Sequence, residues 1–216
     1  MLFFTPFMEA PMLALSLSLA LSAAPLDASV TLEDGVYQVR WTADAPVDVL
    51  ISADPDGADA RMISQADTDG AHSEPRDDEA GRAYFVLRAE DGSETVTALR
   101  LLPLEGGRNF RDLGGYATED GLSVAWGRVY RSGVMDDLTT ADYRYLSSLG
   151  IGVICDFRAV SERQEEPTDW AAGEIDYVAW DYEMDPSAFM AAFADGEMSA
   201  ERSREAFIGF YRQTPY

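Results

Sequence analysis

The chain has 216 residues, of which 47% are hydrophobic and 25% charged, a composition that fits one large or two small folded domains and excludes wholesale disorder. Its 39 acidic and 16 basic residues give a formal net charge of −23, which repels nucleic acid phosphates and argues against a nucleic-acid binder. With one cysteine, Cys155, and one histidine, His72, an intramolecular disulfide is excluded, and a zinc site or a Ser-His-Asp triad is disfavoured.

The amino terminus predicts export. Residues 12–24 (MLALSLSLALSAA) are apolar or small and carry no charge, and small residues occupy the positions that a signal peptidase reads. A helix of this run would extend about 20 Å, too short for a hydrocarbon core of about 30 Å. We therefore expect residues 1–24 to be a signal peptide cleaved after Ala24, or alternatively after Ala28, and the mature protein to be periplasmic or secreted, with no stable membrane span. A disordered or buried apolar tail is the alternative.

Residues 25–103 predict a small all-β domain, because apolar and polar residues alternate in short runs without a helical period. Asp34-Gly35 and Asp91-Gly92 predict type I′ hairpin turns, since both residue types tolerate a positive φ. The predicted strands are Ser29–Leu32, Val36–Trp41, Val47–Ser52, Arg82–Arg88 and Thr95–Leu102. About six or seven such strands favour a β-sandwich of immunoglobulin or fibronectin type, with Trp41 in its core.

The acid-rich segment 54–80 predicts a solvated loop. Its run Asp67-Thr68-Asp69-Gly70 is similar to calcium ligands, but the spacing of an EF-hand and its closing glutamate are missing. We therefore expect no metal there. The polar neighbours of His72 place that histidine in the same exposed loop.

Residues 108–163 differ from the rest of the chain in charge, with seven arginines against eight acids. This local recovery of positive charge is the first indication that the segment has a function. Within it, Thr139 and Asp142 have the spacing of a capping box, and apolar residues then recur at helical spacing until Gly150. We expect a helix between these positions.

Residues 151–158 (IGVICDFR) are almost continuously apolar, which predicts a strand buried on both faces of a parallel sheet. Asp156 and Arg158 fall at its carboxyl end, where open α/β sheets carry functional loops. A short helix beginning at 161–163 and ending before Pro167, a strand over Tyr177–Tyr182 and one or two helices within Ser187–Tyr211 are expected to follow. This alternation predicts an α/β domain.

Five motifs then identify a resemblance. The chain contains, in this order, NFRDLGGY, WGRVYRSG, LTTAD, LGIGVICDFR and SERQEEP. In order and spacing these motifs resemble the atypical bacterial tyrosine phosphatase family, which includes dual-specificity and lipid phosphatases. The resemblance covers residues 104–216. It implies an α/β cysteine-phosphatase domain that hydrolyses a phosphorylated protein or phospholipid through a cysteinyl-phosphate, with no metal and no other cofactor.

The Cys-x5-Arg phosphate loop of that family is missing from the sequence. Six residues after Cys155 stands Ser161, where the loop needs an arginine that forks onto the phosphate oxygens. Cys155 also lies inside the predicted strand, so we expect it to be a core residue. Because the loop of relatives follows the helices with which this chain ends, we expect residues 104–216 to be the first part of an incomplete domain.

The resemblance implies roles for five residues. Asp156 and Arg158 are expected to line the site in a supporting catalytic role. Arg111, Asp112 and Arg131 are expected to take part in substrate binding, the first two beside the phosphate loop. A structural ion pair is the alternative for each of them, since such pairs are common at sheet edges. Two classes of function stay open: an exported phosphatase, and a non-catalytic binding module built from a β-sandwich and a phosphatase-like remnant.

Overall fold

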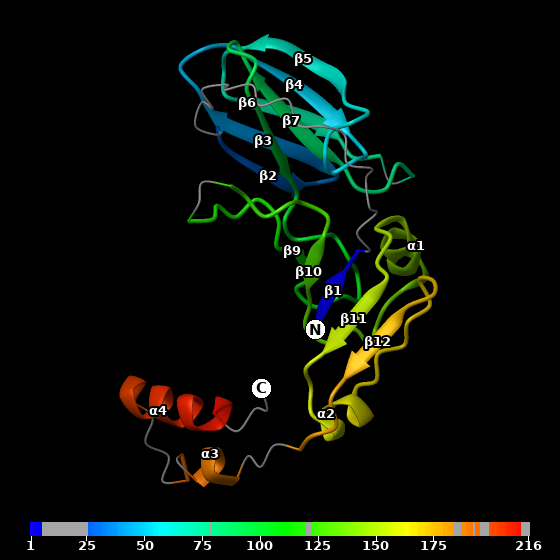
Figure 1. The fold of residues 1–216 in the computed structure, drawn as a ribbon, viewed down its shortest axis with the longest axis vertical. Helices are drawn as coiled ribbons and strands as arrows, with labels where there is room; N and C mark the ends of the chain where they lie inside the picture. Colours follow the sequence, from blue (N-terminus) through cyan, green and yellow to red (C-terminus); the bar gives the residue numbers. More distant parts are fainter. Residues whose placement is uncertain are drawn as a thin grey trace, which may run out of the picture.

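The computed structural model describes residues 1–5, 26–77, 79–119, 122–183, 187–191, 193–194 and 199–212. Most of the predicted signal peptide, residues 6–25, lies outside the described residues. None of the helices described is long and apolar enough to cross a membrane. Figure 1 shows a unit of β-strands at the top, a second sheet beneath it, and the last two helices apart at the lower left.

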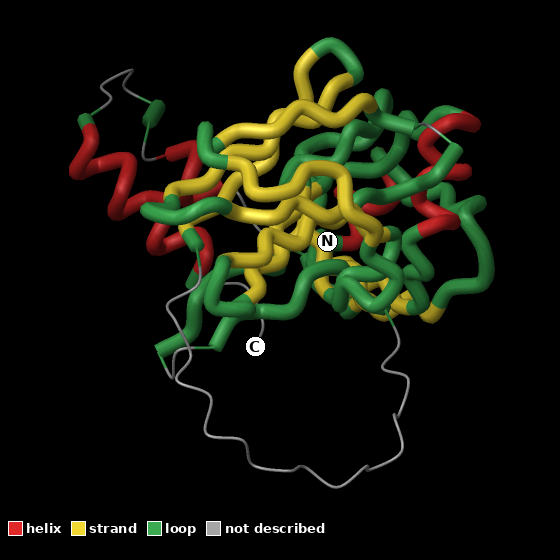
Figure 2. The backbone as a smooth tube through the Cα atoms, turned by 90° about the horizontal axis from the view of Figure 1, so that it is seen from above, coloured by secondary structure: helices red, strands yellow, loops and turns green. Residues whose placement is uncertain are grey.

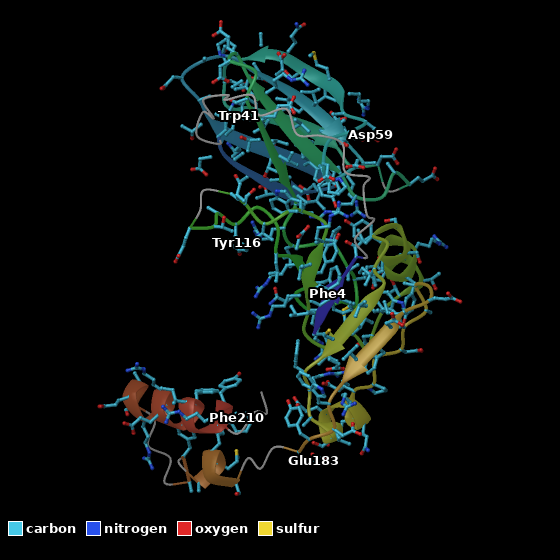
Figure 3. All side chains as sticks on the ribbon, viewed as in Figure 1. Phe4, Trp41, Asp59, Tyr116, Glu183 and Phe210 are labelled. Carbon is cyan, nitrogen blue, oxygen red and sulfur yellow. The ribbon has the colours of Figure 1, made fainter. Side chains whose placement is uncertain are left out.

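Two antiparallel sheets form the upper unit. One has the strand order β2-β3-β6, with bounds β2 (Asp27–Glu33), β3 (Val36–Thr42) and β6 (Ala71–Pro75). The other has the order β5-β4-β7-β8, with bounds β5 (Arg61–Asp67), β4 (Val47–Ser52), β7 (Tyr84–Ala89) and β8 (Glu94–Ala98). Buried side chains of both sheets meet in one cluster: Tyr37, Val39, Trp41, Val49, Phe85 and Leu87. The expected β-sandwich with Trp41 in its core is confirmed (Figure 3).

The prediction of a loop over residues 54–80 is wrong, because the segment contains β5 and β6. All residues of these two strands are half-buried or exposed, so their sequence lacks the apolar alternation that marks the other strands. His72 lies within β6 opposite Val39, and only 18% of its side chain is exposed, which also corrects its assignment to an exposed loop. Among the described residues, no group of His, Cys, Asp or Glu could hold a metal ion.

The two predicted hairpin turns differ. Asp34 and Gly35 have φ of 50° and 77°, which confirms the type I′ turn between β2 and β3. Between β7 and β8 only Gly92 has a positive φ, of 83°, so the type I′ prediction for Asp91-Gly92 is wrong. The Asp91 carboxylate accepts hydrogen bonds from the backbone N–H and the hydroxyl of Ser93, which stabilises a longer loop with the glycine in the left-handed position.

The second sheet is mixed and has five strands in the order β12-β11-β1-β10-β9. The bounds are β12 (Asp176–Ala179), β11 (Val153–Asp156), β1 (Leu2–Phe4), β10 (Val129–Arg131) and β9 (Arg111–Asp112). The central strand β1 is antiparallel to both β10 and β11, and β12 is parallel to β11. The strands β10, β11 and β12 therefore run in the same direction, and their carboxyl ends lie at the same edge of the sheet.

Only one face of this sheet is buried. In β11, Ile154 and Asp156 are buried, whereas Val153 and Cys155 are half-buried. On the covered face Ile154 packs with Phe3 and with Leu146 of helix α1 (Thr140–Ser148). The prediction that β11 is buried on both faces is therefore wrong, and so is the expectation that Cys155 belongs to the core. The complete cysteine-phosphatase fold stays a prediction.

The helices follow the predicted order. Helix α1 begins at its capping box, in which the Thr139 hydroxyl accepts a hydrogen bond from Asp142 N and the Asp142 carboxylate accepts one from Thr139 N. The remaining helices are α2 (Val160–Glu165), α3 (Ser187–Ala191) and α4 (Ala200–Tyr211). Rings of Phe189 and Phe207, with centroids 5.0 Å apart, join α3 to α4. In Figure 2 the helices lie at the sides of the molecule and the strands fill its middle.

Candidate functional site

One row of residues crosses all five strands of the mixed sheet in register. Residues in register on neighbouring strands share a face. The row consists of Arg111, Arg131, Leu2, Cys155 and Val178, and all five side chains are half-buried or exposed. In the adjacent row Asp112, Tyr130, Phe3 and Ile154 are buried, whereas Tyr177 on the edge strand β12 is 45% exposed. The sheet thus has a core face and an open face, and the open face carries two of the predicted site residues together with the cysteine.

Arg111 and Arg131 lie directly opposite each other on β9 and β10. Side chains in this arrangement start about 5 Å apart, and two like charges so placed repel each other. Within the described part of the chain neither arginine has a carboxylate partner, and Arg111 donates a hydrogen bond to the amide oxygen of Asn109 over 3.2 Å. Two neighbouring guanidinium groups on an open face are suited to bind a doubly charged anion such as a phosphate monoester.

Asp156 and Arg158 form an ion pair at the carboxyl end of β11. The Arg158 Nη2 lies 2.6 Å from Asp156 Oδ2, and Nε lies 2.9 Å from Oδ1. Tyr177 on β12 donates its hydroxyl to the same Oδ2 over 2.6 Å. Burial raises the pKa of the Asp156 carboxyl, but the hydrogen bonds from Arg158 and Tyr177 outweigh it, so this pKa lies below its ordinary value. Asp156 is therefore a carboxylate that accepts hydrogen bonds.

The guanidinium of Arg158 also holds the segment after helix α2. Its Nη1 donates to the Glu166 carbonyl over 2.7 Å, and its Nη2 donates to the Thr168 hydroxyl over 2.8 Å. The hydrogen bond to Asp156 raises the pKa of Arg158, which keeps the guanidinium charged. The pair thus links the end of β11 to residues 166–168 and orders this edge of the sheet.

The amino terminus lies between the two pairs. The Met1 ammonium donates to the Ser132 carbonyl over 3.1 Å, next to Arg131. Burial lowers the pKa of this amine, which also interacts electrostatically with Asp156, Arg158 and Arg131. The amine thus lies near the carboxyl ends of β10 and β11, the edge where open α/β sheets bind ligands.

Asp112 lies on the core face of the sheet, in the row of Tyr130 and Phe3. Its carboxylate has no exposed surface, accepts hydrogen bonds from Gly114 N (2.7 Å) and Gly127 N (2.8 Å), and pairs with Arg82 over 2.5 Å. In this arrangement Asp112 organises the backbone rather than facing the open side. Its contact with substrate stays a prediction, as do the substrate contacts of Arg111 and Arg131.

Sequence reasoning missed Arg82 and Tyr177, the partners of Asp112 and Asp156. Arg82 stands at the start of a predicted strand of the sandwich, and nothing in its neighbourhood marks it as a partner of a residue thirty positions later. Tyr177 could have been found, because a strand over residues 177–182 parallel to β11 would bring its first residues beside the end of β11.

Comparison with known proteins gives a family. The model of the tyrosine phosphatase family matches residues 102–216, a little over half of the chain. A Cupriavidus necator protein named "Putative tyrosine-protein phosphatase" is 36% identical over 146 residues, which cover 60% of this chain and 53% of that protein. The chain thus matches about half the length of this relative.

Similar solved structures cover 38% of the chain. They include an Fn3-like protein from Clostridium thermocellum (21% identity, TM-score 0.31, 99% of that chain) and pectate lyase Pel3 from Pectobacterium carotovorum (14% identity, TM-score 0.30, 28% of that chain). Likenesses this low carry no argument about the fold. The family match covers a little over half of the sequence and includes Arg111, Asp112, Arg131, Asp156 and Arg158. The chain belongs to the tyrosine phosphatase family.

Proposed function

We propose that the chain is part of an exported phosphomonoester hydrolase that acts on phosphorylated protein, with phosphotyrosine or with dual specificity, through a cysteinyl-phosphate. The observation that carries the proposal is the pair Arg111 and Arg131, in register on the open face and without a carboxylate partner among the described residues, in a chain of net charge −23. Positive charge so concentrated in an acidic protein favours an anionic substrate. The family of the chain supports a phosphate as that anion.

In the proposed reaction a cysteine thiolate attacks phosphorus, the substrate oxygen leaves and takes up a proton, and water then releases phosphate from the sulfur. Arg111 and Arg131 bind the non-bridging phosphate oxygens and offset the charge that builds up on them. Asp156 stays ionised and holds Arg158 in place at the edge of the site. The nucleophile is not Cys155, because the sixth residue after it is Ser161 and no arginine stands where the phosphate loop needs one.

Hydrolysis of an aryl phosphate tests the proposal. The purified 216-residue chain is expected to be silent, since loss of the nucleophile from a covalent mechanism costs on the order of 10⁵ to 10⁶ in turnover. A coding sequence extended by about 60 residues, enough for a strand, a loop and a helix, is expected to add the Cys-x5-Arg loop and metal-independent, vanadate-sensitive activity.

Two results would contradict this reading. Hydrolysis by the 216-residue chain that is lost in Cys155→Ser would make Cys155 the nucleophile. A coding sequence without the loop, together with a compact and inactive chain, would favour the non-catalytic binding module, which the full hydrogen bonding of Asp156 also fits.

Export is the second part of the proposal, and it rests on the apolar run over residues 12–24. Cleavage after Ala24 would remove β1 from the centre of the mixed sheet. Amino-terminal sequencing of the protein from its native host is expected to start near Pro25. An intact Met1 on protein from the cytoplasm would show that residues 1–24 are not a cleaved signal.

A further inference from the structure

Arg82 of the β-sandwich reaches into the family-matched part of the chain. Only 6% of the residue is exposed. Its Nη1 lies 2.5 Å from Asp112 Oδ2 and 3.1 Å from the Tyr130 hydroxyl, and its Nη2 donates to the Leu99 carbonyl over 3.2 Å. The ring of Tyr84 lies 4.8 Å from the guanidinium carbon. One buried side chain of the sandwich thus contacts both β9 and β10.

The Arg82 guanidinium is charged in this buried environment. Burial by itself lowers the pKa of the guanidinium, but Tyr130, Tyr84 and Asp112 outweigh burial and raise it above its ordinary value. A buried ion pair that loses one partner leaves an uncompensated charge, which is strongly destabilising. A lysine would keep the charge but not the planar fork or the stacking on aromatic rings.

Through Asp112, this pair fixes the local backbone. The Asp112 carboxylate accepts hydrogen bonds from the amides of Gly114 and Gly127, so it ties the turn after β9 to the segment that enters β10. These segments pack closely: a Cβ added to Gly114 would come within 2.5 Å of the Trp126 Cα, and one added to Gly127 within 2.5 Å of the Tyr84 hydroxyl. The Asp112 carboxylate thus links the turn after β9 to the start of β10 in a closely packed region.

Arg111 is the residue next to Asp112 in β9, which has only two residues and lies at the edge of the sheet. So short an edge strand has few ladder hydrogen bonds of its own. The Asp112 carboxylate holds this strand from the core face, in addition to the backbone hydrogen bond from Asp112 N to the Arg100 carbonyl, and Arg111 lies on the open face opposite Arg131.

We propose that Arg82 is a positioning residue through which the β-sandwich holds Arg111 beside Arg131. The sandwich then contributes to phosphate binding by fixing the position of Arg111. The phosphate-binding part of this proposal rests on the proposed function. Other contacts also join the two units. Arg128 pairs with Asp56 at 3.3 Å in an exposed position, away from β9. The segment after β8 contacts β9 itself, since Asp112 N donates to the Arg100 carbonyl over 3.0 Å and Arg100 Nη1 donates to the Asp112 carbonyl over 3.0 Å.

The test uses the full 216-residue chain labelled with ¹⁵N. The variants are Arg82→Met and Arg82→Lys, and the matched control is Arg88→Met on β7, whose exposed partner is Glu94 at 2.7 Å. The readouts are the amide resonances of Gly114 and Gly127, the Nε resonance of Arg111, and the affinity for inorganic phosphate measured by titration. All are recorded at a temperature at which each variant is fully folded.

Arg82→Met is expected to shift all three resonances and to weaken phosphate binding at least about tenfold, the loss of one well-placed charged contact. The resonance shifts and the phosphate affinity of Arg82→Lys are expected to lie between those of Arg82→Met and the wild type. Arg88→Met is expected to match the wild type in both. If Arg82→Met does not fold, Arg82→Lys decides by the same readouts.

Unchanged resonances and unchanged phosphate affinity in a folded Arg82 variant would overturn the proposal. Wild-type chain that binds no phosphate, combined with shifted resonances in the Arg82 variants, would reject the phosphate-binding role of Arg111 and Arg131 while supporting the positioning role of Arg82. The two failures are thereby distinguished.

Discussion

Asp156 lies at the carboxyl end of β11 with no exposed side-chain surface, and Arg158 and Tyr177 donate hydrogen bonds to its oxygens. Its pKa lies below the ordinary value, so the folded chain binds this proton less readily than the unfolded chain does. The stability that follows is complete above the unfolded pKa of about 3.9 and is lost as the pH falls through the lowered folded pKa.

Asp156→Asn is therefore expected to lower the free energy of unfolding by about 2 kcal/mol at pH 7, because hydrogen bonds to a charged group contribute about that much to stability. Below pH about 4 the difference from the wild type should shrink, because the wild type then loses the same contribution. Urea unfolding over a pH series measures both effects. Asp181→Asn is the control, since Asp181 pairs with Arg163 at 2.8 Å but has a side chain that is 87% exposed, and it should change little. Equal effects of the two substitutions would contradict the buried role of Asp156.

At the scale of elements, β1 determines whether the mixed sheet is continuous. It is hydrogen-bonded on one side to β10 and on the other to β11, and its Phe3 is fully buried against Phe110 with ring centroids 5.3 Å apart. Without β1 the sheet would fall into two pairs with unpaired backbone groups at the gap.

In the 216-residue chain with an intact amino terminus, Phe3→Ala is expected to cost about 3 to 4 kcal/mol of unfolding free energy, because it removes a buried ring from the core. Phe4→Ala is the matched control: the neighbouring side chain points to the opposite face and is only half-buried, so its loss should cost clearly less. Denaturant titration of both variants gives the comparison. A Phe3→Ala variant as stable as the wild type would show that β1 is not part of the folded sheet in solution.

Helix α1 depends on its amino-terminal cap. Thr139→Ala removes the hydroxyl that accepts a hydrogen bond from Asp142 N and is expected to cost about 1 kcal/mol. Thr140→Ala, one position later at an exposed site inside the helix, should be neutral or slightly stabilising, because alanine has the higher helix propensity. Thermal unfolding followed by circular dichroism separates the two, and equal midpoints would contradict the capping role of Thr139.

The whole molecule exposes apolar surface at one end. Three neighbouring residues at and beyond the edge strand β12 are close to half exposed or more: Tyr177 (45%), Val178 (46%) and Trp180 (58%). Helices α3 and α4 lie apart from the sheet in Figure 1, and Phe207 and Tyr211 of α4 are also exposed. Exposed apolar residues gathered on an unpaired edge strand favour association with other molecules.

The 216-residue chain is therefore expected to bind a hydrophobic dye and to associate as its concentration rises. The double substitution Val178→Ser and Trp180→Ser should remove a large part of the dye fluorescence. Leu122→Ser is the control, since Leu122 is 68% exposed but lies far from β12 in the sequence and outside the mixed sheet. If the control lowers the fluorescence as much as the double variant, the dye does not report on this edge.

Features that depend on a few neighbouring residues were determined by the sequence alone. The capping box of Thr139 and Asp142 and the turn at Asp34-Gly35 needed only backbone preferences and hydrogen bonds within four residues. The positions of the core strands of the sandwich could also be predicted locally, because a strand buried on one face alternates apolar and polar residues. The five ordered motifs were enough to indicate the family.

Only the tertiary structure decided which residues meet. Arg82 and Asp112 pair across thirty positions of sequence, and Arg111 and Arg131 become neighbours only because β9 and β10 pair in one register. The insertion of β1 between β10 and β11 brings residues 1–4 next to residues more than 120 positions away. Such pairings depend on the match between distant surfaces, which no local pattern encodes, and they determined that one face of the sheet is open, that Cys155 lies on it and that Asp112 lies beneath it.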